Sequence, residues 1–386
     1  MSTGELLAYR DRFPILADTT YLINHSLGAM PAAAEDRLVE YARVWKTRGI
    51  RAWGEGWWDL PLTVGDQIGR LIGAAPGMVA MHQNVTVTTA IVLSCFPFAG
   101  ERRRIVYMEG EFPSVRYLLQ AQRGAEVTVV PDLHALLEAI DERTLLVPFS
   151  HVLFKTAEIQ DVATVAQRAH DVGAHVLLDA YQSVGTVPLD VGSTGVDFAT
   201  GGSVKWLCGG PGAGWLYVRP DLIERLEPAL AGWQAHARPF DFEPGLEYAT
   251  GIARFLTGTP NVPALYAATA GYDVIEEIGV ERIRENSLRQ TELLIALLDA
   301  EGFEVTCPRE PDRRGGTVTV ATPAFEAVHR ELGERDVICD FRPETGLRLG
   351  PHFFTSDDEL SFAVAQIADI VQSGAYERHL GAAARF

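Results

Sequence analysis

Between residues 79 and 220 the sequence alternates short runs typical of β-strands with stretches of helical periodicity. The runs typical of strands include residues 104–108, 126–130, 144–148, 175–179 and 214–218. Residues 162–172, between two of these runs, repeat apolar side chains at helical spacing. Val176, Leu177 and Leu178 follow one another without a polar residue, as in strands that are covered on both faces. The alternation predicts an α/β fold with a mostly parallel sheet and helices on both of its faces.

After residue 260 the pattern changes, which predicts a second, smaller α+β domain. A helical stretch covers about residues 262–300, and runs typical of strands follow at 303–307, 317–321 and 337–341. Ser356-Asp-Asp-Glu359 fits a helix capping box. We expect a large domain at 61–260 and a small C-terminal domain at 261–386. Residues 1–60, rich in aromatic residues and glycine, would cover the cleft as part of the small domain or of a dimer interface.

Composition limits the possible partners. Of the 386 residues 47% are hydrophobic, which is enough to bury a large core. A net charge of −18 disfavours nucleic acid and anionic lipid as partners. The four cysteines are far apart and form no CxxC pair, so we expect neither a disulfide framework nor a metal site. We see no apolar signal segment and no apolar run long enough to span a bilayer, and therefore expect a cytoplasmic protein without membrane contact.

Two charged residues follow strands, at the sheet edge where α/β proteins bind ligands. Asp179 ends an apolar strand, where a carboxylate needs a cationic or hydrogen-bonded partner, or serves as an ordinary helix N-cap. Lys205 stands between glycine-rich turns at residues 201–212, after a predicted strand at 196–200. The glycines permit tight turns and a close approach of the backbone to a ligand. A lysine in a cleft can lose its proton and attack a carbonyl, whereas an ordinary lysine would stand in a surface loop.

A third feature is the stretch Gln83-Asn-Val-Thr86-Val-Thr88-Thr89, which leads into a predicted helix at 90–96. Small hydroxyl residues and free amides at a helix start bind anions such as phosphate, although an ordinary N-cap has the same composition. Pyridoxal phosphate (PLP) needs a carboxylate at its ring nitrogen, a lysine for its aldehyde and donors for its phosphate. Lys205 follows Asp179 by 26 residues, and the combination predicts a PLP site in which Lys205 holds the cofactor as a Schiff base.

The chain also resembles fold-type I PLP enzymes of class V, and several of its stretches resemble kynureninases. These stretches are Tyr21-Leu-Ile-Asn-His-Ser26-Leu-Gly28-Ala-Met-Pro31, Asn84-Val85-Thr86-Val87, Glu111-Phe112-Pro113-Ser114, Gly232-Trp233-Gln-Ala-His236, Phe255-Leu-Thr-Gly-Thr259-Pro260 and Phe341-Arg342-Pro343…Gly346-Leu-Arg348-Leu-Gly-Pro351-His352. The resemblance covers most of the chain and implies the fold-type I PLP-dependent transferase fold. It also implies a homodimer with sites at the subunit interface.

The resemblance implies a role for each matched residue. Val85 and Thr86 would bind the cofactor phosphate, Phe112 would stack on the ring, and Gln182 would lie near the phenolic oxygen. Trp233 would reach the phosphate, and Thr259 the site, of a neighbouring subunit. Ser26 would lie near the substrate, and Arg348 would grip its α-carboxylate through a bidentate guanidinium contact.

Three positions depart from the kynureninase pattern. Gln182 stands where kynureninases have a histidine, Val204 where they have a tyrosine before the lysine, and Val115 where an acidic residue is expected. Glutamine and valine do not titrate, so these changes bear on the reaction more than on PLP binding. Gln182 is shared with cysteine desulfurases, but the nucleophilic cysteine that those enzymes carry after the substrate arginine is missing here, which disfavours a desulfurase.

The first hypothesis is a PLP-dependent, kynureninase-like hydrolase that cleaves an L-amino acid into an anthranilate-type product and alanine. Lys205 would remove the α-proton, and Asp179 would stabilise the protonated pyridine. The second hypothesis keeps the fold and the cofactor but changes the reaction to that of a class V aminotransferase, a β-lyase or an epimerase. The third is a non-catalytic protein that retains the fold.

Overall fold

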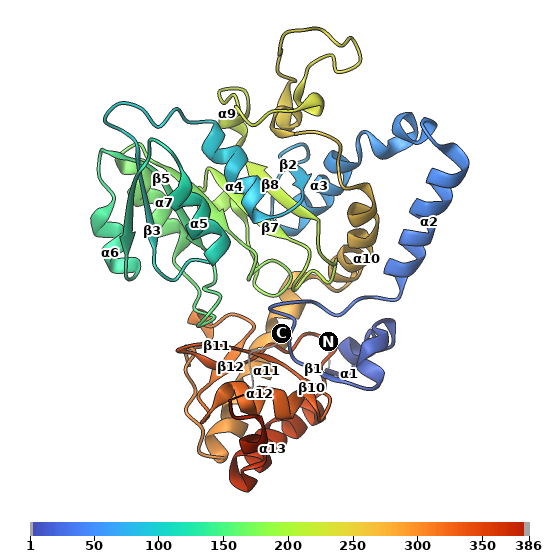
Figure 1. Cartoon of the computed structure of the whole chain (residues 1–386), viewed down its shortest axis with the longest axis vertical. Helices are drawn as coiled ribbons and strands as arrows, with labels where there is room; N and C mark the ends of the chain where they lie inside the picture. Colours follow the sequence, from blue (N-terminus) through green and yellow to red (C-terminus); the bar gives the residue numbers. More distant parts are fainter. Residues whose placement is uncertain (1–2, 382–386) are drawn as a thin grey trace.

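A seven-stranded sheet forms the centre of the larger part of the computed structural model, which describes residues 3–381 (Figure 1). Its strand order is β2-β8-β7-β6-β5-β3-β4. The strands are β2 (Val79–His82), β3 (Arg104–Met108), β4 (Glu126–Val130), β5 (Thr144–Ser150), β6 (His175–Asp179), β7 (Phe198–Gly202) and β8 (Gly214–Val218). β4, β3, β5, β6 and β7 run parallel, and β8 pairs antiparallel with both β7 and β2. The predicted mostly parallel sheet is therefore confirmed.

Apolar side chains cover both faces of this sheet. Val176 and Leu178 belong to one hydrophobic cluster, and Leu177, between them, belongs to the other, as the alternation of side chains along a strand requires. The helices beside the sheet are α3 (Leu60–Leu71), α4 (Val85–Ser94), α5 (Pro113–Ala121), α6 (Leu133–Ala139), α7 (Val162–Asp171), α8 (Val191–Thr194) and α9 (Pro220–Ile223). The uninterrupted apolar runs in the sequence follow from this double cover.

The C-terminal residues build a smaller body below the sheet (Figure 1). An antiparallel sheet has the order β11-β12-β9, with β9 (Val318–Val320), β11 (Asp340–Arg342) and β12 (Gly346–Leu349). Helices α11 (Val280–Ala300), α12 (Phe325–Gly333) and α13 (Asp357–Ser373) pack with it, and α10 (Val262–Ile278) precedes them. The capping box is confirmed, because Ser356 and Glu359 exchange hydrogen bonds at the start of α13.

The structure corrects three predicted elements in this region. The stretch 262–300 is two helices, because the chain turns at Gly279, whose φ of 89° favours glycine. Residues 303–307 form no strand, and only Val305 bridges to Val320. The run 337–341 is divided between β10 (Val337–Ile338) and β11, which belong to different sheets.

The N-terminal residues run along both parts of the molecule (Figure 1). After α1 (Thr3–Leu7), strand β1 (Thr20–Tyr21) pairs in parallel with β10 of the small body. Helix α2 (Ala33–Arg48) packs against α10, and a π-helical turn follows at Trp53–Trp57. Shorter 3-10 turns lie at Arg10–Arg12, Pro14–Ala17, Trp233–Ala235, Gly251–Phe255, Pro311–Arg313 and Ala375–His379. No helix among residues 3–381 is long and apolar enough to cross a membrane.

Candidate active site

A cavity of about 520 Å³ lies at the carboxyl ends of the parallel strands, where ligands bind in sheets of this kind. Eight of the ten predicted site residues line it: Ser26, Val85, Thr86, Phe112, Asp179, Gln182, Lys205 and Arg348. They come from segments that are far apart in the sequence. Trp233 and Thr259 do not line this cavity.

Lys205 lies in the turn after β7, is half-buried, and lines the cavity. Its Nζ atom is 5.5 Å from the ring centroids of both Phe112 and Tyr181. Burial lowers the pKa of Lys205 to about 8, against the opposing charge of Asp179. The chain has only three lysines, and of the three, all described, Lys205 alone lines the cavity. A nucleophilic amine that loses its proton near neutral pH is therefore available there.

Asp179 ends β6 and faces Ser150 of β5 and Thr200 of β7 in the strand register. Its Oδ1 atom accepts the amide N–H of Tyr181 at 2.9 Å. Burial raises the pKa of Asp179, and the Tyr181 amide and Lys205 oppose this shift. The side chain lies in the cavity rather than at a helix start, so the alternative of a helix N-cap is wrong.

The glycines around Lys205 accommodate the protein's own side chains. A Cβ atom at Gly201 would lie 2.2 Å from the Trp215 indole, and one at Gly202 would lie 2.3 Å from the Tyr181 ring. Gly201 and Gly202 therefore make room for side chains and do not line the cavity, whereas Gly210 and Gly212 do. Gly210 and Gly212 have φ values of 71° and 91°, which confirms the predicted tight turns.

Helix α4 presents its first amides to the cavity. It begins at Val85, five residues before the predicted start, because Asn84 caps it by accepting the Val87 amide N–H at 3.2 Å. The first amides of a helix, here those of Val85 and Thr86, have no carbonyl partner within the helix, and the Val85 amide N–H instead meets the phenol oxygen of Tyr181. Both residues line the cavity, and the arrangement suits an anion such as phosphate.

Arg348 lines the cavity from β12 but is already paired within the protein. Its Nε and Nη2 atoms donate to Asp340 at 2.7 and 2.6 Å, and Nη1 donates to the carbonyl of Phe154. Three of the five guanidinium N–H groups are engaged, which leaves two for a ligand. Asp340 also contacts His25 at 2.9 Å and Arg342 at 3.2 Å.

Sequence reasoning missed Asp340 and His25, although both lie in or beside stretches that carry the family resemblance. Burial lowers the pKa of His25 to about 4, so this histidine is neutral at pH 7. Although burial alone would raise it, His25 and Arg348 hold the pKa of Asp340 well below its usual range. Asp340 therefore stays charged beside Arg348.

Sequence reasoning also missed Glu111, which precedes Phe112 in the sequence and is 1% exposed. Its Oε1 atom accepts the Ser150 amide N–H at 3.0 Å, and its Oε2 atom lies 2.5 Å from the Ser150 hydroxyl. Burial raises the pKa of Glu111 to about 8, and the hydrogen bonds from Ser150 oppose this shift. The carboxyl group is thus protonated at neutral pH, and no signal in the sequence indicates its burial.

The three positions that depart from the kynureninase pattern are Gln182, Val204 and Val115, and each has defined contacts. The Gln182 amide donates to the His25 carbonyl at 3.0 Å and accepts the Trp206 indole N–H at 3.3 Å. Val204 lines the cavity, and Val115 packs in the apolar core. Ser26 is brought over the lysine loop because Gly28 donates its amide N–H to the Val204 carbonyl at 2.8 Å. A Cβ atom at Gly28 would lie 2.1 Å from the Lys205 carbonyl oxygen, so only glycine fits this crossing.

Trp233 and Thr259 lie on other surfaces. Trp233 is 43% exposed, and its ring stacks on Phe242. Thr259 lines a groove beside Trp45 and Ile50, two of the most exposed apolar side chains. Their predicted reach into a neighbouring subunit stays a prediction.

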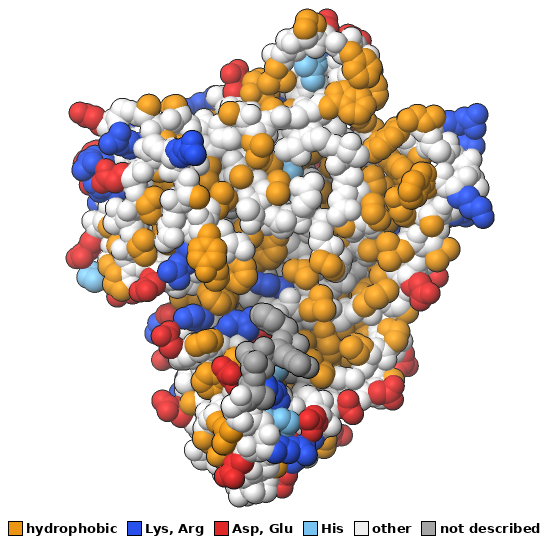
Figure 2. All heavy atoms as spheres, viewed as in Figure 1, with side chains coloured by type: hydrophobic (Ala, Val, Ile, Leu, Met, Phe, Trp, Pro, Cys, Tyr) orange, Lys and Arg blue, Asp and Glu red, His pale blue; other side chains and the backbone are white. Residues whose placement is uncertain are grey.

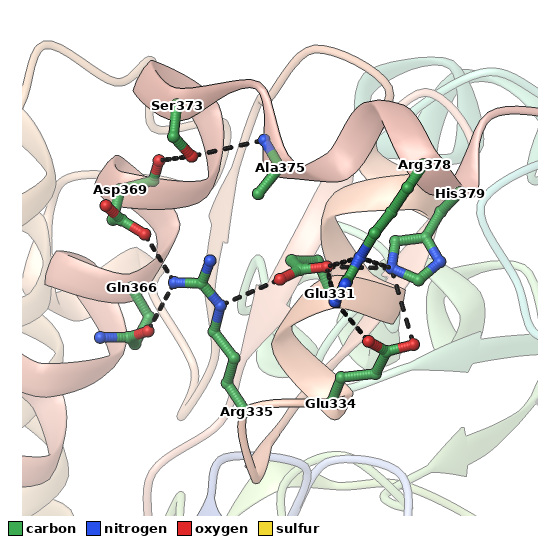
Figure 3. A network of polar contacts seen from close by, with 9 residues as sticks. All are labelled: Glu331, Glu334, Arg335, Gln366, Asp369, Ser373, Ala375, Arg378 and His379. Carbon is green, nitrogen blue, oxygen red and sulfur yellow. Dashed lines mark hydrogen bonds and ion pairs between the residues drawn. The ribbon is translucent and has the colours of Figure 1, made fainter.

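A polar network between α12 and the turn at Ala375–His379 gathers Glu331, Glu334 and His379 within reach of a single ion (Figure 3). Two arginines already neutralise it. Arg335 Nε donates to Glu331 at 3.1 Å, and Arg378 donates to both glutamates. The network fastens α12 to the C-terminal turn, and we assign no metal to it.

The family model described as aminotransferase class-V matches residues 32–339. A kynureninase from Pseudomonas fluorescens is 33% identical over 384 residues, which cover 95% of this chain and 92% of that protein. A kynureninase from Burkholderia pseudomallei (strain 1106a) is 32% identical over 389 residues, which cover 96% and 94%.

Solved structures share the fold at lower identity. The apo structure of a cysteine desulfurase from Thermococcus onnurineus NA1 has a TM-score of 0.83 and 20% identity, and the match covers 97% of this chain and 99% of that one. A C-DES mutant with glycine covalently linked to its PLP cofactor has a TM-score of 0.85 and 23% identity, with 93% and 99% covered. The TM-scores show that these proteins share the fold of this chain.

Proposed function

Because the chain belongs to the class V aminotransferase family of PLP-dependent enzymes, we propose that it is a kynureninase-type hydrolase. It would cleave the side chain of an L-amino acid to give an anthranilate-type product and alanine. Support comes from two kynureninases that are 33% and 32% identical over almost the whole chain. The residues fit the cofactor, because one cavity holds a lysine, a buried carboxylate, an aromatic ring and the first amides of a helix.

The observation that carries the proposal is the position of Lys205. It is the one lysine in the described cavity, and Asp179 lies on the neighbouring strand end. PLP, when bound to the substrate amine, draws electrons from the bonds at the α carbon. Lys205 holds the cofactor and then moves the α-proton, since its amine loses a proton near pH 8. Asp179 keeps the pyridine nitrogen protonated.

Binding and orientation fall to the other cavity residues. Val85 and Thr86 hold the phosphate through their amides, and Phe112 packs on the ring. The two remaining N–H groups of Arg348 bind the α-carboxylate of the substrate. With the carboxylate fixed, the bond that breaks is held in one orientation relative to the cofactor, which speeds cleavage. Gln182 and Ser26 complete the wall near the substrate.

The proposal includes a homodimer. Apolar side chains gather on the surface over α2 and over the loop near residues 230–250 (Figure 2). Trp45, Ile50 and Phe242 are 62%, 81% and 75% exposed, which is costly for large apolar side chains unless a partner covers them. Trp233 and Thr259 lie in the same two regions. Trp233 and Thr259 of one subunit would complete the cavity of its partner.

Product analysis tests the reaction. Purified protein loaded with PLP should convert L-kynurenine or 3-hydroxykynurenine to equal amounts of alanine and an anthranilate-type product. Lys205→Ala should form neither product, and Lys155→Ala, at a surface ion pair with Glu344, should match the wild type. If the loaded wild-type protein turns over neither substrate, the hydrolase assignment fails while the cofactor assignment stands.

A second candidate is a β-lyase, aminotransferase or epimerase on the same cofactor. Gln182 and Val204 favour it, because neither can exchange protons where kynureninases have titrating side chains. A desulfurase is disfavoured, since none of the four cysteines, all of them described, lines the cavity. Conversion of the bound cofactor to its amine form by an amino acid would identify transamination, and a 2-oxo acid product would identify elimination.

A further inference from the structure

Tyr181 is a cavity residue that the family resemblance does not explain. It stands two positions after Asp179, where its backbone N–H donates to the Asp179 carboxylate at 2.9 Å. Its ring lines the cavity opposite Phe112, with the Lys205 Nζ atom 5.5 Å from both ring centroids. Tyr181 therefore adjoins both Asp179, through its backbone, and Lys205, through its ring.

The phenol end of Tyr181 points toward the start of helix α4. Its oxygen lies over Gly202, where a Cβ atom would approach it to 2.4 Å, so the glycine is what makes room for it. The phenol oxygen accepts a hydrogen bond from the Val85 amide N–H, which opposes the rise that burial causes in the pKa of Tyr181. A neutral phenol has one O–H to donate.

The neighbouring positions lack a donor of this kind. Val204, the residue before Lys205, lines the cavity with an apolar side chain. The Ser203 hydroxyl is engaged with the Ala213 carbonyl at 2.6 Å and with the Tyr272 hydroxyl. Of the side chains near the first turn of α4, Tyr181 offers a hydroxyl from the strand side and Thr86 offers one from the helix side.

We propose that the Tyr181 phenol binds the phosphate group of PLP, together with the Val85 and Thr86 amides, and supplies the donor that position 204 lacks. The hydroxyl donates to a phosphate oxygen, and the ring, held between Gly202 and the cavity, fixes its direction. Charge-assisted hydrogen bonds of this type are the strong ones. This inference rests on the cofactor and not on the proposed substrate.

Pyridoxal is the probe that isolates the phosphate, because it has the same aldehyde and ring without the phosphate group. The cofactor-free protein is titrated with PLP and with pyridoxal, and the visible absorbance band of the lysine-bound cofactor reports each Kd. Tyr181→Phe keeps the ring over Gly202 and removes only the hydroxyl. Tyr217→Phe is the matched control, because Tyr217 pairs with Val79 and Ala199, at the opposite end of the strands.

Tyr181→Phe should weaken PLP about 10- to 100-fold, as expected for a lost hydrogen bond to a charged group, and leave pyridoxal within about twofold. The ratio of the pyridoxal Kd to the PLP Kd should fall accordingly, while Tyr217→Phe keeps the wild-type ratio. An unchanged ratio overturns the proposal, whether both affinities hold or both fall together. If Tyr181→Phe does not fold, Tyr181→Leu is measured by the same ratio. Failure to turn over kynurenine would not affect this result.

Discussion

At the scale of single residues, the cavity concentrates groups whose ionisation the protein has changed. The pKa of Lys205 is lowered to about 8, and the pKa of Glu111 is raised to about 8. In both cases burial is the main cause, because it disfavours the charged form of either group. Such paired shifts are common where a protein performs acid–base chemistry.

Lys205 should be the single point of covalent attachment. Borohydride reduction of the PLP-loaded protein should fix the cofactor on one peptide, the one that contains residue 205, because the other two lysines lie outside the cavity. In Lys205→Ala the visible band of the lysine-bound cofactor should be absent, and Lys155→Ala should retain it. Mass spectrometry of the digested protein checks both, and attachment at Lys46 or Lys155 would contradict the assignment.

Glu111 should make stability depend on pH. The unfolded chain ionises this carboxyl near its ordinary value of 4.5, while the folded protein does so only near pH 8. Between these values the unfolded chain binds fewer protons, so the free energy of unfolding falls as pH rises. In Glu111→Gln this fall should be smaller. Urea unfolding of the cofactor-free protein from pH 5 to pH 8 measures it, and parallel curves for the two proteins would refute the buried-carboxyl explanation.

Residue-scale predictions from the sequence succeeded where a side chain marks a strand end. Asp179 and Lys205 could be placed together because parallel strands bring their carboxyl ends to one edge. Glu111 and Asp340 could not be identified in this way. Their importance comes from burial against Ser150 and Arg348, which are 39 and 8 residues away in the sequence.

At the scale of elements, the hairpin of β11 and β12 supplies Arg342 and Arg348 to the cavity wall. Its antiparallel register sets Asp340 directly opposite Arg348. The carboxylate holds the arginine in place and also balances the positive charges of Arg348 and Arg342 near Lys205. Arg348 is therefore positioned in advance, with its two free N–H groups left for a substrate.

Asp340→Asn should be strongly destabilising. Removing one partner of a buried ion pair leaves an uncompensated charge, which typically costs about 3–5 kcal/mol of folding free energy. Asp299→Asn, at an exposed pair with Arg309, is the control and should change stability little. Urea unfolding at pH 7 compares the two variants. If both variants lower the free energy of unfolding by the same small amount, Arg348 does not depend on the Asp340 charge, and the prediction is wrong.

The elements also show the limit of periodicity. Residues 104–108, 126–130, 175–179 and 214–218 form strands with the predicted bounds. The apolar residues of 104–108, 175–179 and 214–218 are buried on both faces, whereas 126–130 is an edge strand whose Val129 is 45% exposed. The run 337–341 is equally apolar, yet it divides between two sheets because β1 pairs with its first half and β12 with its second. Neither partner can be inferred from the run itself.

At the scale of the whole molecule, the large sheet, the small body and the N-terminal residues each supply part of one cavity. The exposed aromatic surface lies apart from it, over α2 and the loop near residues 230–250 (Figure 2). The proposed homodimer would cover this surface and bring Trp233 and Thr259 to the partner's cavity.

Complementation between two inactive variants tests this arrangement. A dimer of Lys205→Ala and Trp233→Ala chains has one site with both residues intact, so mixing the unfolded variants and refolding them together should restore part of the activity or of the cofactor band. Each variant refolded alone is the control. If mixing restores nothing while the mixed dimer forms, Trp233 acts within its own subunit or only in packing.

The sequence by itself determined the α/β class, the family and the strand-end pair of Asp179 and Lys205, because local periodicity and short motifs record which faces of each strand are buried. Only the tertiary structure decided that Gly202 makes room for Tyr181, that Asp340 holds Arg348, and that Glu111 keeps its proton. These depend on contacts between distant segments and on the exclusion of water. Local sequence patterns predict neither of them.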